Sequence, residues 1–231
     1  NKSINKIKGL NFFKKVKVES EDIESENTKV INISVEEKAT GEISLGAGFG
    51  TSGGTVGFAV KENNYMGKGI GLTSSLTLNE DQIRGAFSLN NPNFANSGKD
   101  LFTSIESTEI DKVKLFGYKS SKVGVTVGTK YEQYENLFFS PSISTFFEDL
   151  NTSGDASANL KKQEGHFFET NLSYGLDYDL RNSKFQPTEG FRSKFSQTLP
   201  LMTATNTIIN GYDFTTHREF TRDMVGSFYF Y

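Results

Sequence analysis

Apolar residues alternate with small or polar residues along the stretch from Gly41 to Asn91. In its first segment one side holds Ile43, Leu45, Ala47 and Phe49, and the other side holds Ser44, Gly46, Gly48 and Gly50. A period of two residues indicates β-strand. The polar sides stay polar over many segments, with no second apolar layer for them to cover. This pattern predicts an antiparallel transmembrane β-barrel, with an apolar outer face toward lipid and a polar inner face.

The same alternation continues to the end of the chain and predicts a mainly β fold with eleven strands from residue 41 onward. We place these strands at residues 41–50, 54–63, 69–79, 82–91, 100–109, 119–131, 136–148, 166–180, 191–199, 206–217 and 223–231. The connections fall into two kinds. Those at 51–53, 79–81 and 151–165 are short or hydrophilic, and those at 63–67, 91–94 and 181–190 are rich in Asn, Gly, Pro and aromatic residues. Such two-sidedness is typical of a barrel whose rims face different compartments.

Residues 1–40 have a different pattern, and we expect them to form the end of a small α+β domain. The segment from Ser3 to Leu10 predicts an amphipathic helix that ends at Gly9. Strands are expected at Lys15–Glu21 and Lys29–Glu37, with an acidic turn, Glu21–Glu26, between them. The linker Lys38–Thr40 is short, so the small domain should lie rigidly against the domain formed by residues 41–231.

Charged residues on the strands are expected to face the lumen of the barrel, because ionised groups on the lipid face are energetically unfavourable. The strand at 166–180 places three carboxylates on its polar side. Five basic residues on other strands fall on the equivalent side. The predicted lumen charges are Arg84, Lys122, Lys130, Glu169, Asp177, Asp179, Arg192 and Lys194.

Composition excludes several classes of function. The chain has 231 residues, a formal net charge of −3 and no Cys, which removes disulfides and thiol catalysis and gives no electrostatic reason to expect nucleic-acid binding. The mean hydropathy is −0.46, and no apolar run approaches the roughly 20 residues of a membrane helix. A β-barrel is compatible with these values, because its apolar residues alternate with polar ones and therefore do not raise the mean hydropathy.

No catalytic constellation is evident, so we expect neither an enzyme nor a cofactor. His166 and His217 are the only histidines, on separate strands near opposite rims. We interpret both as polar residues at the rims of the barrel. The alternative is that they bind a metal or act in acid–base catalysis. Glu169, Asp177 and Asp179 could form a calcium site, but pairing with Arg or Lys in the lumen is the favoured interpretation. Gly46-x-Gly48-x-Gly50 is no nucleotide loop, because no helix follows it.

Those glycines weaken the first strand, because Gly packs and pairs poorly in a sheet. If this strand closes the barrel against the last one, that seam is the easiest to open. An open seam exposes unpaired N–H and C=O groups that can template another strand. The alternative is that Gly simply permits close approach at a tightly coiled barrel edge.

Five motifs follow one another along the chain. They are Ile4-x-x-Ile7-x-Gly9-Leu10-x-Phe12-Phe13; Gly41–Gly50; Asn63-Asn64-Tyr65-Met66-Gly67-Lys68-Gly69; Asn91-Pro92-Asn93-Phe94; and Asp179-x-Arg181 followed by Phe185-x-Pro187-Thr188-x-Gly190. Together, and in this order, they resemble the BamA family of outer-membrane assembly factors, whose superfamily also includes TamA and the two-partner secretion transporters. The resemblance covers essentially the whole chain.

The resemblance implies that residues 1–40 are the end of a periplasmic POTRA domain and that residues 41–231 begin a sixteen-stranded outer-membrane barrel. The chain would then be a fragment, with Tyr231 at a truncation point. The implied function is insertion of β-barrel proteins into the outer membrane, with client strands pairing at Ile43–Gly50. Implied partners are unfolded outer-membrane clients, outer-membrane lipid, periplasmic chaperones and accessory lipoproteins. The alternative is a secretion pore of the same superfamily, of the two-partner or TamA-like kind.

Overall fold

The structure is a computed structural model in which residues 7, 10, 12–23, 28–50, 53–184, 186–203, 206–221 and 224–231 are described. Two antiparallel sheets account for most of them: a two-stranded hairpin and an eleven-stranded sheet. The prediction of a mainly β, antiparallel fold with eleven strands from residue 41 is confirmed. None of the described helices has the length and apolar character that a membrane-spanning helix requires.

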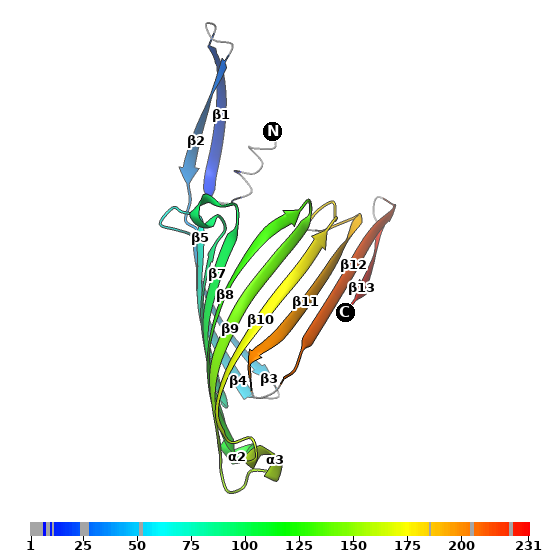
Figure 1. Cartoon of the computed structure of the whole chain (residues 1–231). Helices are drawn as coiled ribbons and strands as arrows, with labels where there is room; N and C mark the ends of the chain where they lie inside the picture. The colour runs from blue at the N-terminus through cyan, green and yellow to red at the C-terminus, as the bar shows by residue number, and fades with distance from the viewer. Residues whose placement is uncertain are drawn as a thin grey trace.

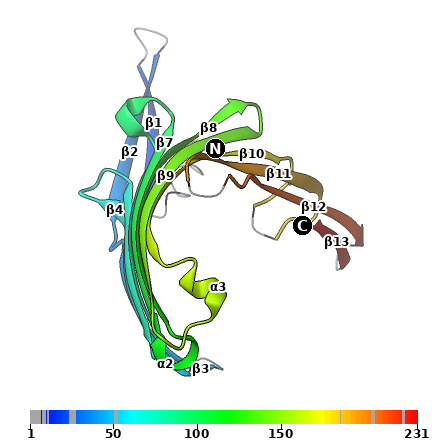
Figure 2. The ribbon, with the colours of Figure 1, turned by 60° about the horizontal axis from the view of Figure 1, so that its bottom comes forward.

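The eleven strands follow one another in the sheet in chain order, so every pairing is between sequence neighbours. They are β3 (Gly41–Gly50), β4 (Gly53–Tyr65), β5 (Ile70–Asn79), β6 (Gln82–Asn91), β7 (Asp100–Lys112), β8 (Tyr118–Tyr134), β9 (Leu137–Thr152), β10 (Gly165–Asp179), β11 (Gly190–Met202), β12 (Ile209–Thr221) and β13 (Met224–Phe230). The sheet curves into a trough, with β3 and β13 as its two edges (Figures 1 and 2).

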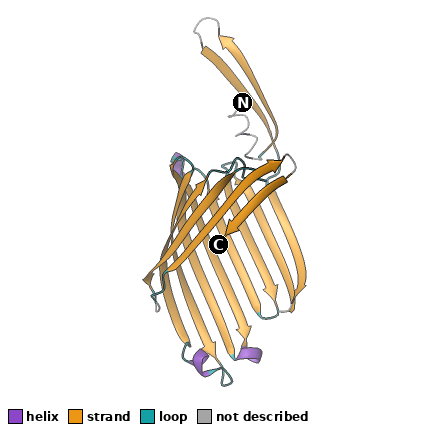
Figure 3. Cartoon of the chain, turned by 90° about the vertical axis from the view of Figure 1, so that its right-hand side faces the viewer, coloured by secondary structure: helices purple, strands orange, loops and turns teal. Residues whose placement is uncertain are grey.

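The hairpin consists of β1 (Phe13–Ile23) and β2 (Thr28–Glu37), and it projects beyond one rim of the trough (Figures 1 and 3). We call this rim the hairpin rim and the opposite one the far rim. The predicted acidic turn Glu21–Glu26 is wrong in its first part, because β1 continues to Ile23 and pairs Asp22 with Lys29. The rest of that turn lies outside the described residues, as does the predicted helix at Ser3–Leu10 apart from Ile7 and Leu10.

Three backbone and side-chain contacts tie the linker 38–40 to the sheets on both sides of it. The Lys38 backbone N–H donates to the Phe12 carbonyl at 3.1 Å. The Thr40 hydroxyl donates to the Glu62 carboxylate at the end of β4. The Asn63 side-chain amide donates to the Thr40 carbonyl at 3.1 Å. These bonds fix the chain where it enters β3.

The far rim carries two short helices that the sequence pattern did not predict. Helix α2 (Val113–Phe116) connects β7 to β8, and α3 (Ala158–Lys161) lies in the connection from β9 to β10. The two connections contact each other, because the Ser153 N–H donates to the Gly117 carbonyl at 2.7 Å. Helix α3 turns inward over the hollow of the trough (Figure 2).

The turn between β10 and β11 needs glycine at Gly190, and substitution there should destabilise the sheet. Gly190 has φ +93°, and an added Cβ would lie 2.2 Å from the Leu180 carbonyl oxygen. We expect Gly190→Ala in the full-length protein to lower the free energy of unfolding by about 2 kcal/mol, measured by urea unfolding. Gly154→Ala is the matched control, since a Cβ there meets nothing within 4 Å. Equal midpoints for the two variants would contradict this account of the turn.

Candidate functional site

The two faces of the sheet differ in chemistry, and the strand register assigns each residue to a face. Residues directly opposite one another on paired strands lie on the same face. One face presents exposed apolar side chains from β3 to β13. They include Leu45, Phe58, Leu76, Phe87, Ile105, Val125, Ile143, Phe168, Tyr212 and Phe228. We call this the apolar face.

The opposite, polar face lies on the concave side of the trough. Side chains on the inner face of a curved sheet crowd together and lose exposure. The most buried polar residues on the strands are Ser120, Asp177 and His217, at 7%, 8% and 7% relative exposure, and the register places all three on this face. It also places all eight predicted lumen charges here, through pairings such as Lys122 opposite Glu148 and Asp177 opposite Lys194.

Several of these charges form ion pairs across neighbouring strands. Arg84 contacts Glu106 at 3.0 Å, and the Lys122 ammonium lies 3.7 Å from Glu148. The same ammonium lies 3.6 Å from the centre of the Phe146 ring. Opposite charges therefore neutralise each other along the polar face.

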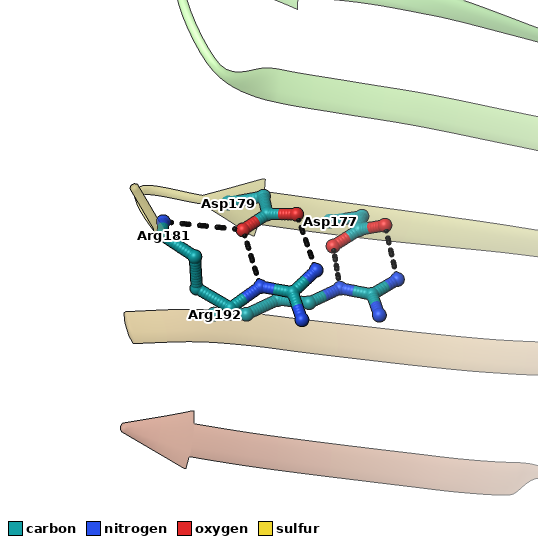
Figure 4. Close-up of polar contacts among 4 residues, drawn as sticks. All are labelled: Asp177, Asp179, Arg181 and Arg192. Atoms are coloured by element: carbon teal, nitrogen blue, oxygen red, sulfur yellow. Dashed lines mark hydrogen bonds and ion pairs between the residues drawn. The ribbon is translucent and has the colours of Figure 1, made fainter. Parts of the chain in front are cut away.

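Two bidentate Arg–Asp pairs occur side by side at the hairpin rim (Figure 4). Asp177 accepts from Arg192 Nε and Nη2, both at 2.7 Å. Asp179 accepts from Arg181 Nε and Nη2, both at 2.8 Å. These hydrogen bonds raise the pKa of the Arg181 guanidinium above its ordinary value, so this residue of the turn stays cationic. The Asp177–Arg192 pair joins the end of β10 to the start of β11, and the Asp179–Arg181 pair fixes the first residues of the turn between them.

The turn that follows these pairs is closed by Asn182, a residue that the sequence analysis did not single out. Its side-chain oxygen accepts from the Thr188 N–H at 3.1 Å, and its amide donates to the Thr188 hydroxyl at 2.7 Å. The motif residues Asp179, Arg181, Thr188 and Gly190 thus act together in one turn. Phe185 lies outside the described residues.

The two histidines lie on different faces at opposite rims. His166 Nδ1 contacts Asp149 Oδ1 at 3.1 Å on the apolar face at the far rim. His217 Nδ1 lies 2.8 Å from the Ser227 hydroxyl on the polar face at the hairpin rim. Among the residues that the structure describes, no group of three or more His, Cys, Asp or Glu could hold a metal ion.

Strand β3 is one of the two edges of the sheet, the other being β13. It pairs with β4 alone, so one side of its backbone has no strand partner among the described residues. All ten of its residues are exposed, with Leu45 at 80% and Phe49 at 95%. The glycines of β3 weaken its packing further, because even an added Cβ at Gly46, Gly48 or Gly50 would have no atom within 4 Å.

A shallow hollow of about 390 Å³ runs along the polar face beside this edge. Small residues of β3, β4 and β5 line it, among them Ser44, Gly46, Gly48, Thr55, Gly57, Ala59, Ser75 and Thr77. No charged residue is among its lining residues. Beside the middle of this edge the polar face is therefore lined mainly by small, uncharged residues, and the charged residues Glu42 and Lys61 lie opposite each other on the same face nearer the hairpin rim.

The Asp177–Arg192 pair should contribute measurably to stability. We expect Asp177→Ala and Arg192→Ala each to lower the free energy of unfolding by about 2 kcal/mol, since each leaves a charge without its partner. The double variant should lose less than the sum, with a coupling of about 1–3 kcal/mol in urea unfolding. The Arg84–Glu106 pair, with both side chains about half exposed, is the control and should couple by less than about 1 kcal/mol. Equal coupling in the two cycles would refute the assignment.

Comparison with known proteins agrees with this architecture. The chain is 26% identical over 200 residues to the outer membrane protein assembly factor BamA of Neorickettsia risticii, which covers 82% of this chain and 26% of that protein. The chain thus spans about a quarter of the length of the relative that it matches.

Two solved structures share the fold. The crystal structure of BamA from Haemophilus ducreyi lacking POTRA domains 1–3 has a TM-score of 0.72 at 19% identity, over 95% of this chain and 45% of that one. CdiB from Acinetobacter baumannii has a TM-score of 0.57 at 12% identity, over 96% of this chain and 44% of that one. The Omp85 superfamily domain matches residues 64–217. With the curved antiparallel sheet, its apolar outer face and its polar inner face, this match shows that the chain belongs to the Omp85 superfamily of outer-membrane β-barrels.

Proposed function

We propose that this chain is part of an assembly factor that inserts β-barrel proteins into the outer membrane, and that β3 pairs with strands of the client. The observation that carries the proposal is the glycine content of β3: Gly46, Gly48 and Gly50 have no side chain that could pack on a neighbouring strand, so this strand is held weakly. The identity to BamA of Neorickettsia risticii supports the same function.

Backbone pairing at this edge would suit clients of many sequences. The N–H and C=O groups of an edge strand accept another strand whatever its side chains are. In hydrocarbon, each unpaired backbone group is unfavourable by several kcal/mol, so a client strand gains stability as soon as it pairs. No nucleotide or cofactor is required for this step.

The small-residue hollow beside β3 adds room for the client. Inward side chains of a strand paired to β3 would lie near Gly46 and Gly48, where the hollow is lined mainly by small, uncharged residues. Outward side chains would continue the apolar face next to Ile43, Leu45 and Phe49. The edge could therefore pair with any membrane strand in which small or polar side chains alternate with apolar ones.

We assign the hairpin to the periplasm as the end of a POTRA domain, with residues 1–40 and 41–231 as the two domains. Chaperone-delivered clients and accessory lipoproteins would then reach the barrel from the hairpin rim. The eight charges of the polar face would line the wet interior, and the chain itself would carry no enzymatic activity.

A secretion pore of the same superfamily is the second candidate, and the charged residues of the polar face favour it, since they would suit a wet passage. In that case an unfolded substrate would pass through the lumen along residues such as Lys122. Pairing at the β3 edge would then have no role in transport.

Cysteine crosslinking in the full-length protein distinguishes the two. We expect Gly48→Cys to form a disulfide with one register of single cysteines along the C-terminal strand of a nascent barrel client, because the position is open and lies at the edge. Scrambling the client strand should abolish the adduct. The adduct is read as a band on a non-reducing gel.

Gly57→Cys is the matched control, since it has equal space and faces the same side one strand farther from the edge. It should give no adduct with the client. Adducts of a soluble unfolded substrate with Lys122→Cys, and none at Gly48→Cys, would support the pore and contradict insertion at β3.

A further inference from the structure

Two turns at the hairpin rim display apolar side chains that neither the fold nor strand pairing requires. The β4–β5 turn exposes Met66 at 73% and the β6–β7 turn exposes Phe94 at 48%. Each turn also carries an exposed lysine, Lys68 in the first and Lys99 in the second. Apolar and cationic side chains are thus displayed together at one level of the rim.

Both turns are held in fixed conformations that include left-handed residues other than glycine. Met66 has φ 55° and Ala95 has φ 53°, a region that side chains other than Asn and Asp rarely occupy. In the first turn the Gly69 N–H donates to the Asn64 side chain at 2.7 Å. In the second, the Gly98 N–H donates to the Asn93 side chain at 2.9 Å. Rigid display of an exposed side chain lowers the entropy that binding would cost.

The exposed side chains of these two turns lie next to the lipid-facing, apolar face of the sheet. The ammonium of Lys99 lies 4.6 Å from the centre of the Tyr131 ring. Tyr131 is paired with Phe139 on the apolar face, where the two rings pack edge to face with centroids 5.8 Å apart. The β4–β5 turn projects from the convex side of the trough in two views (Figures 1 and 2). The turns therefore lie where the bilayer surface meets the rim.

The charge of this surface selects one kind of partner. Among the described residues, neither Lys68 nor Lys99 forms an ion pair with a carboxylate. Lysine next to aromatic and apolar side chains is the combination that favours the headgroup layer of a membrane, and it favours anionic lipids in particular. We propose that the two turns, through Met66, Lys68, Phe94 and Lys99, dock on anionic phospholipid headgroups of the leaflet at the hairpin rim.

Tryptophan fluorescence in the full-length protein tests this, because this stretch contains no Trp. The Phe94→Trp emission, taken as the difference from the parent protein, is measured in phosphatidylcholine vesicles containing phosphatidylglycerol, with one of the two lipids brominated near its headgroup. We expect brominated phosphatidylglycerol to quench more strongly than brominated phosphatidylcholine at equal mole fraction. Lys68→Gln and Lys99→Gln should each lower this preference by about fivefold.

Controls at the far rim make the result specific. Leu115→Trp in α2 is equally a reporter on an exposed apolar residue, and Lys114→Gln removes a lysine beside it. Neither should show or change a preference for phosphatidylglycerol. Equal quenching of the Phe94→Trp reporter by the two lipids would overturn the proposal. Quenching of this reporter by aqueous iodide alone would also overturn it, since the surface would then face water. Loss of lipid quenching when accessory subunits bind would overturn it too, since a protein would then cover the surface. The proposal depends on the outer-membrane placement of the superfamily and not on client insertion.

Discussion

Backbone hydrogen bonding in a medium without water is the constraint on which this structure depends. Within hydrocarbon every N–H and C=O must find a partner in the protein, and a sheet supplies partners only between adjacent strands. The strands β4 to β12 each have two neighbours and satisfy this condition. The described parts of the two edges, β3 and β13, each have one neighbour. Strand β3 also contains four glycines, and an added Cβ at three of them, Gly46, Gly48 and Gly50, would meet nothing within 4 Å. The need for backbone hydrogen-bond partners therefore stabilises the strands inside the sheet, and it also makes pairing with the edge strand β3 favourable for another strand.

Alternation of side chains follows from the same geometry and divides the chemistry between two faces. Successive residues point to opposite sides of a strand, so the apolar side meets lipid and the polar side crowds into the concave interior. Strand pairing brings charges on the inner face into register, and several of them form ion pairs, among them Arg84 with Glu106 and Lys122 with Glu148. Arg181 is bonded to Asp179 two residues before it, and Arg192, directly opposite Asp179, reaches diagonally to Asp177. The bidentate pair between Asp177 and Arg192 thus adds to the backbone pairing of β10 and β11 at the hairpin rim.

The sequence predicted the eleven strands well, because a period of two residues persists wherever one face meets lipid and the other meets water. It predicted strand ends less well: β8 and β9 extend to 17 and 16 residues, beyond the predicted 119–131 and 136–148. The four-residue helices α2 and α3 are too short to show a helical period. The partner of Arg192 and the tie formed by Asn182 depend on register and turn geometry, which alternation does not contain. The POTRA assignment and the roles of the lumen charges stay predictions.

Hydrogen exchange resolved along the strands, with the full-length protein in lipid nanodiscs, tests the central claim most directly. The account predicts that amides of β3 exchange orders of magnitude faster than those of β8 and β9, because opening at β3 breaks pairing on one weakly packed side. Peptides covering Gly41–Gly50 and Tyr118–Thr152 give the comparison within one sample. Equal protection of these two regions from exchange, in the absence of any client, would contradict the account, since β3 would then be as firmly paired as β8 and β9.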